Sequence, residues 1–177
     1  MELIGRQYRP YVRVGKFLGR HYPGAMAYIT SEARRELLET VADAIEEIGL
    51  ALAALGAAYE QLDEQSADRL EELLFRPVQV AYGRAQRTHS GFAERHGLAG
   101  RSFEQASAGL PSQGVKGFLQ RADEAVGEAD AILADLQDSM RPVEVGDPEL
   151  RAGLAEVREL VGGVRAQARE FERTFGR

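Results

Sequence analysis

The fold is decided by residues 31–62, which read SEARRELLETVADAIEEIGLALAALGAAYEQL. Apolar side chains recur here three or four residues apart, and no proline interrupts the run. Because an α-helix turns once in about 3.6 residues, this spacing places them on one face of a long helix. Such a face needs other long helices to cover it. The stripe consists of Leu37, Val41, Ala44, Ile48, Leu52, Leu55, Tyr59 and Leu62.

A second seam of small residues runs beside this stripe. It contains Ala42, Gly49, Ala53 and Gly56. Each glycine costs roughly 1 kcal/mol of helix propensity relative to alanine. The seam therefore has two explanations. Either an alanine-rich helix tolerates these glycines, or the small residues let a second helix approach closely.

Three further segments supply the partner helices, at residues 66–96, 112–140 and 148–175. Pro77 predicts a kink or short break in the first of them, because proline removes one backbone hydrogen bond. Asp147 followed by Pro148 is typical of a helix start. Four amphipathic segments without a strand pattern predict an all-α protein, an antiparallel four-helix bundle.

The remaining segments are harder to interpret. Residues 97–111 form a glycine-rich connection, in which Ser102–Gln105 fits a capping box and predicts a helix of one or two turns. Residues 1–30 combine helical spacing with glycines and a proline, so we expect irregular or short helical structure there. We interpret residues 1–177 as one helical-bundle domain.

Composition narrows the protein class. No stretch is apolar enough to span a bilayer, and Glu2 argues against a secretory leader. The chain has no cysteine, so disulfides and thiolate chemistry are excluded. We expect a cytoplasmic protein without a cofactor and without membrane contact.

Charge is distributed in blocks, although the net charge is only −6. Residues 1–31 carry five basic side chains and one acidic side chain. Residues 32–72 carry three basic and twelve acidic side chains, and residues 73–101 carry five basic side chains and one acidic side chain. Local patches of this kind determine which partners a protein attracts.

Six side chains of the second segment are candidates for ligand or anion binding. Tyr82, His89 and His96 lie near its apolar face, which suggests a polar cluster in a small-molecule pocket between helices. Arg84, Arg87 and Arg95 lie on the other side with Arg76, and this basic stripe suggests contact with phosphate or nucleic acid.

The spacing of Arg84 and His89 resembles the arginine-x4-histidine motif of HEPN-type ribonucleases, which are also helical bundles. The resemblance implies a ribonuclease, although Ala85 stands where that family usually has a polar residue. The two side chains lie about 140° apart on a regular helix. No Glu-x-x-His motif occurs, and His89 and His96 are about 10.5 Å apart along one helix, so we expect no metal site.

These patterns favour a protein that acts by binding another protein rather than by catalysis. The strict four-and-three spacing of the apolar residues in 148–175 suggests that this helix pairs with a copy of itself in a homodimer. The alternatives are a nucleic-acid- or phosphate-binding protein and a small-molecule-binding bundle.

Overall fold

The structure, a computed structural model, describes residues 23–175; most of these residues are helical, and no strand occurs among them. The all-α prediction is confirmed. In chain order the elements are α1 (Pro23–Tyr59), α2 (Glu64–Leu70), the π-helical turn η1 (Glu71–Phe75), α3 (Arg76–Arg95), the 3-10 turn η2 (Pro111–Gln113), α4 (Gly114–Asp138), the single turn α5 (Arg141–Glu144) and α6 (Pro148–Phe175).

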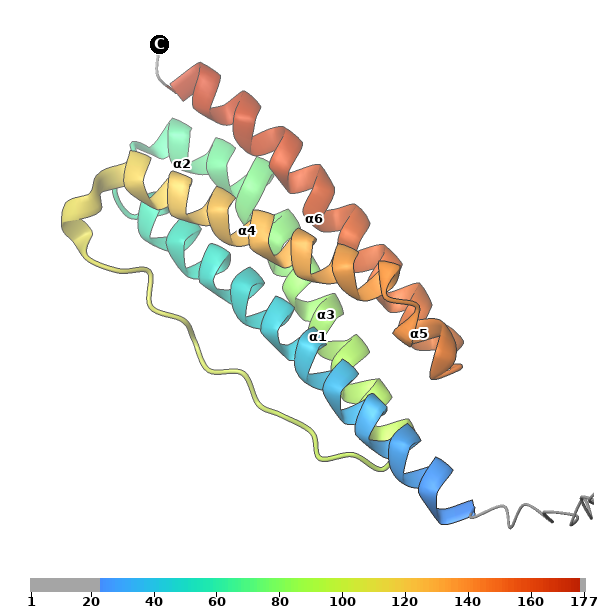
Figure 1. The fold of residues 1–177 in the computed structure, drawn as a ribbon. Coiled ribbons are helices and arrows are strands. Elements are labelled where there is room, and N and C mark those ends of the chain that lie inside the picture. Colours follow the sequence, from blue (N-terminus) through green and yellow to red (C-terminus); the bar gives the residue numbers. More distant parts are fainter. Residues whose placement is uncertain (1–22, 176–177) are drawn as a thin grey trace, which may run out of the picture.

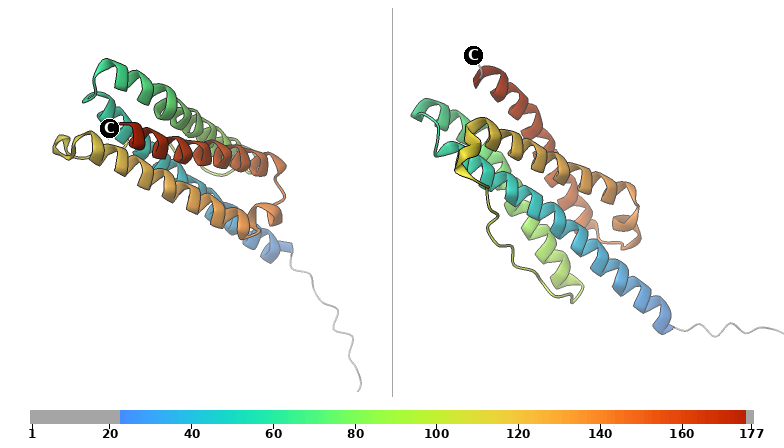
Figure 2. Two further views of the ribbon diagram at one scale, coloured as in Figure 1. Left: turned by 90° about the horizontal axis from the view of Figure 1, so that it is seen from above. Right: turned by 60° about the vertical axis from the view of Figure 1, so that its left-hand side comes forward.

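The four long helices lie side by side around one core. Figure 1 shows α1 and α6 running toward its upper left, whereas α3 and α4 run toward its lower right. Helix α1 packs on α4 and α3, and α6 packs on the same two helices. Each long helix therefore lies between two neighbours of opposite direction, as the views in Figure 2 also show.

The predicted apolar faces meet in this core. Leu37, Ile48 and Leu55 of α1 are buried, while Tyr59 at its end is exposed. The seam of α6 is buried as well, from Leu150 to Phe171. Since this seam packs inside its own chain, it offers no surface to a second copy, and it gives no support to a homodimer.

Helix α1 begins earlier than the sequence interpretation placed it. It starts at Pro23, so the last residues of the supposedly irregular segment are helical, whereas residues 1–22 lie outside the described residues. Proline is favoured in the first helical turn because it has no N–H to leave unpaired. At its other end α1 stops at Tyr59, and the next helix starts at Glu64 rather than Ser66, with the Asp63 side chain accepting a hydrogen bond from the Ser66 N–H.

Pro77 is accommodated without a break in the helix. The Arg76 N–H donates to the carbonyl of Glu71, five residues back, in a π-helical turn. Helices α2 and α3 therefore form one continuous rod, with the wider turn placed directly before the proline. The sequence predicted a kink or short break at Pro77, and the structure instead has a π-helical turn directly before it.

The connection after α3 is extended, and the helix predicted at Ser102–Gln105 is absent. Residues 98–110 contain no helical turn, and we call them the strap. Because α3 and α4 run in the same direction, the chain must return along the whole bundle. Thirteen residues cover about 43 Å when extended but only about 20 Å as a helix, and α4 alone is roughly 37 Å long. The strap then leads through η2 into α4, which starts at Gly114 rather than at Ser112.

Helices α3 and α6 approach each other tightly at Gly153. A Cβ atom added there would lie 2.7 Å from Cγ2 of Thr88, whose hydroxyl donates to the Arg84 carbonyl. Gly162 lies on the same helix, and a Cβ added there would meet nothing within 4 Å.

We predict that Gly153→Ala destabilises the protein by about 1–3 kcal/mol, because the added methyl group forces the two helices apart. Gly162→Ala is the matched control and should stabilise it by up to about 1 kcal/mol through helix propensity. Urea unfolding followed by circular dichroism measures both. Equal effects of the two substitutions would contradict the proposed close contact.

Candidate binding site

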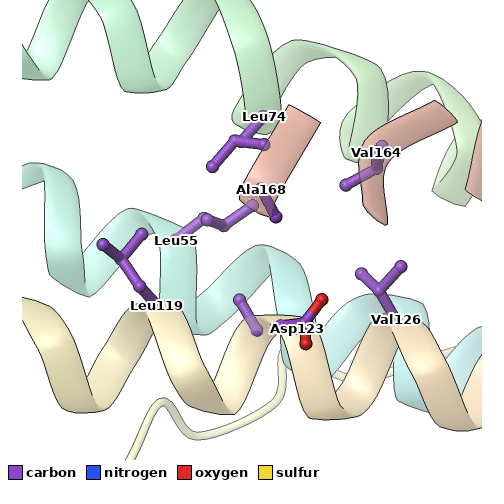
Figure 3. Close-up of a pocket in the computed structure, with 8 residues that line it drawn as sticks. Leu55, Leu74, Leu119, Asp123, Val126, Val164 and Ala168 are labelled. Atoms are coloured by element: carbon purple, nitrogen blue, oxygen red, sulfur yellow. The ribbon is translucent and has the colours of Figure 1, made fainter. Parts of the chain in front are cut away.

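The core of the described residues contains one small gap between its helices. Figure 3 shows this gap, which lies between α1, α4, α6 and η1. Leu55, Leu74 and Val164 line it, and the Asp123 carboxylate lies at its edge. The gap measures only about 10 Å³, roughly the space of one water molecule. This gap is therefore too small to hold a small-molecule ligand.

Three hollows lie outside the core, along the face where α1 and α3 meet the strap, and a separate one of about 470 Å³ lies between Pro77 and α6. One hollow of about 600 Å³ has Gly49, Ala53 and Gly56 of α1 as its floor, and the rings of Phe75 and Tyr82 line its walls. A second, of about 510 Å³, lies toward Glu46 and Arg101, and a third, of about 260 Å³, extends toward Tyr59. Neighbouring hollows share lining residues, so together they form one furrow, which we call the α1–α3 furrow.

The small-residue seam of α1 forms the floor of this furrow. A Cβ added at Gly49 would lie 3.1 Å from the Tyr82 ring, and one at Gly56 would lie 3.8 Å from Phe75. At Gly49 the seam admits the Tyr82 ring of α3, whereas at Gly56 the contact with Phe75 is an ordinary one, so neither interpretation of the seam holds along its whole length. Aromatic rings of α3 lie over the glycines and leave open space between them.

Two side chains of the strap hold it against the bundle. The Phe103 ring packs edge-on against His89, with 5.2 Å between ring centroids. The Arg101 guanidinium lies 5.7 Å from the Phe103 ring centroid and pairs with Glu39 and Glu46 of α1. The sequence interpretation missed both residues, although an isolated aromatic residue in a polar loop is a signal for a buried anchor.

His89 is buried beneath this anchor. Its side chain is 2% exposed, and Nδ1 has no hydrogen-bond partner. Burial lowers the pKa of His89; the nearby Glu39 carboxylate opposes that shift, and the Arg101 guanidinium adds to it. The imidazole is therefore held neutral under the strap, and its protonation would weaken the packing.

The walls and rim of the furrow are acidic. Glu46, Glu47, Glu60, Glu71 and Glu104 line the three hollows, whereas Arg101 is the single cationic side chain among the described residues that line them. Burial raises the pKa of Glu47, and repulsion from Glu128 and Glu46 adds to the shift while Arg121 opposes it. Carboxylates that repel one another in this way favour a cationic ligand.

The arginines of the predicted basic stripe are mostly engaged in ion pairs. Arg84 Nε lies 2.6 Å from a carboxylate oxygen of Glu156 on α6, and Arg76 pairs with Glu71 at 2.9 Å. Arg87 is exposed on α3, and no carboxylate partner is found for it among the described residues. The charge of the stripe is therefore largely compensated within the bundle.

Arg95 and His96 belong to a network at the end of α3. Both nitrogens of the Arg95 fork donate to Asp147 at 2.9 Å, and His96 Nε2 lies 3.0 Å from the same carboxylate. Asp147 also caps α6, because it accepts the Leu150 N–H at 2.8 Å. Burial alone would raise the pKa of Asp147, but the hydrogen bonds from Arg95, Leu150 and His96 lower it to about 2.

The six predicted site residues therefore do not form one site. Tyr82 lines the furrow, and its pKa is raised by burial while a hydrogen bond with Gln86 opposes the shift. His89 faces the strap, and His96 faces Asp147. Arg84 contacts α6 and so points away from His89, which places the two residues of the ribonuclease-like spacing on different sides of α3.

Two searches of the described residues bear on other functions. No group of histidine and acidic side chains there has the geometry to hold a metal ion. None of the helices in residues 23–175 is sufficiently long and apolar to cross a membrane.

Comparison of the chain with protein-family models, with curated proteins and with solved structures found no match.

We predict that the stability of the protein falls as the pH drops below about 6.5, the ordinary pKa of histidine, because of His89. Its pKa is lowered in the folded state, so the unfolded chain takes up the proton first and acid favours unfolding. His89→Leu should remove this part of the pH dependence. Thermal unfolding at several pH values tests it, and identical pH dependence of both proteins would contradict the buried neutral imidazole.

We predict that Asp147→Ala lowers the free energy of unfolding by about 1–3 kcal/mol, since it removes a helix cap and leaves Arg95 paired only with Glu149. Asp147→Asn should cost less, because an amide oxygen still caps α6. The folded pKa lies below the ordinary aspartate value, so this stabilisation is present above about pH 4 and is lost toward pH 2.

Urea unfolding of the wild type and both variants from pH 7 to pH 2 measures this difference. The gap between wild type and Asp147→Asn should close as the pH falls through that range. A gap that stays constant would mean that the charge of Asp147 contributes nothing.

Proposed function

We propose that the protein acts by binding another protein, and that the α1–α3 furrow receives a basic, partly apolar segment of that partner. The observation that carries this proposal is the open furrow with its small-residue floor, aromatic walls and acidic rim. Glycine and alanine let a polypeptide backbone approach α1 closely, and aromatic rings offer flat apolar surface to its side chains.

The strap supports the proposal, because it is an extended polypeptide already bound to this face. Its attachment uses an aromatic side chain, Phe103, and an arginine, Arg101. A partner segment with the same two kinds of side chain would find equivalent contacts along the furrow. Extended segments of this kind combine backbone contact with side-chain anchors in many protein complexes.

The charge of the furrow favours a polypeptide over nucleic acid. Nucleic-acid sites are built from lysine and arginine facing phosphates, whereas carboxylates dominate this rim. Three of the four arginines that suggested phosphate binding, Arg76, Arg84 and Arg95, pair with Glu71, Glu156 and Asp147 instead.

Selection of random peptides displayed on phage against the full-length protein tests the proposal. We expect enriched peptides that combine arginine or lysine with aromatic or aliphatic residues. Ala53→Trp fills the floor of the furrow and should weaken the binding of these peptides about tenfold or more.

Ala131→Trp is the matched control, because Ala131 is exposed on α4 outside the furrow and should leave binding unchanged. Circular dichroism confirms that both variants fold. Peptides that bind Ala53→Trp as tightly as the wild type would place their site elsewhere and would overturn the proposal.

A further inference from the structure

We infer that the resident occupant of the α1–α3 furrow is the chain's own segment 1–22, which folds back along α1. This inference rests on the proposed function, since it assigns an occupant to the same furrow. A partner protein would then have to displace a segment that is covalently attached, so the resting protein is self-inhibited.

The segment is long enough to reach the furrow. It joins the bundle at Pro23, and Gly49 at the near part of the floor lies roughly 39 Å further along α1. Twenty-two extended residues span at most about 73 Å. About twelve residues would cover the distance, which leaves roughly ten for contact with the furrow.

The path along α1 has the opposite charge to the segment. Exposed carboxylates follow one another three or four residues apart from the first turns of α1 to the furrow, namely Glu32, Glu36, Glu39, Asp43 and Glu46. Among the described residues, Arg101 and Arg141 are the cations that pair with members of this row. The segment carries Arg6, Arg9, Arg13, Lys16 and Arg20 against the single acid Glu2.

The apolar residues of the segment match the floor and walls of the furrow. Leu3, Ile4, Tyr8 and Tyr11 alternate with its first two arginines. The furrow offers glycine and alanine between Phe75, Tyr82 and Phe103. Large side chains fit such a floor, while the arginines between them reach the acidic rim. The strap uses the same combination in Phe103 and Arg101.

Two spin labels on the full-length chain test this inference. The chain has no cysteine, so cysteines introduced by Gln7→Cys and Gln79→Cys are labelled uniquely. Gln79 is exposed on α3 between the furrow residues Phe75 and Tyr82. Pulsed electron-spin resonance should give a short, narrow distance distribution at low salt. About 0.5 M salt should broaden and lengthen it, since the Debye length falls below about 5 Å.

Charge-reversal variants identify the contact surface. Glu60→Lys with Glu104→Lys reverses two rim carboxylates and should abolish the short distance. Asp68→Lys with Glu72→Lys is the matched control, because it changes the net charge equally at exposed positions that do not line the furrow. Dilution with excess unlabelled protein should leave the short distance intact, as contact within one molecule requires.

A broad, long distance in the wild type at low salt would overturn the inference. Equal loss of the short distance in both charge-reversal variants would also overturn it, because the contact would then reflect net charge alone. Loss of the signal on dilution would assign the segment to a second copy instead. None of these results tests the proposed function. That proposal fails if the selected peptides bind Ala53→Trp as tightly as they bind the wild type.

Discussion

The direction of α4 is the constraint on which the functional face of this protein depends. Because α3 and α4 run the same way, the chain between them must return along the outside of the bundle, and only extended backbone covers that length. The strap that results crosses the face of α1 and α3 and is anchored by Phe103 over His89 and by Arg101 on α1. Small residues beneath it leave the furrow open on both sides.

Charge is compensated unevenly over the surface. On the side of α6, arginines meet carboxylates of neighbouring helices: Arg84 meets Glu156, Arg158 meets Asp130, and Arg95 meets Asp147. Exposed pairs of this kind contribute little to stability, and the buried Asp147 network is the exception. On the side of the strap, the row of carboxylates on α1 has few cations near it. Because of this excess of negative charge, the strap face attracts a cationic segment, whereas the arginine stripe does not.

Much of the architecture could be predicted from the sequence because it follows from helical periodicity. The sequence predicted the bounds of α6 and its cap at Asp147. It also predicted most of the buried stripe of α1. Spacing within one helix says which residues share a face, but not which helix covers that face. The partners of Arg84 and Arg95 and the burial of the α6 seam in its own chain therefore could not be predicted.

The strap shows the same limit of local reasoning. Ser102–Gln105 fits a helical cap locally, but the length that the connection must span requires extended chain. Local propensity yields to tertiary geometry when the two conflict. The furrow residues were partly found, since the sequence interpretation singled out the small seam of Gly49 and Gly56 and left open whether a helix approaches it closely. Phe103 and Arg101 were missed because their contacts come from α1 and α3, far away in the sequence.

The central claim is that a basic segment occupies the face between α1, α3 and the strap. The most direct test is the amide NMR spectrum of the full-length protein in low salt and in about 0.5 M salt, read at its glycines. Gly49 and Gly56 lie on the furrow floor, whereas Gly162 and Gly163 lie on α6 with open space around them. Release of the segment should move the signals of Gly49 and Gly56 and leave those of Gly162 and Gly163 in place. If all four glycine signals respond alike, or the two furrow signals stay fixed, nothing charged is bound there and the account is contradicted.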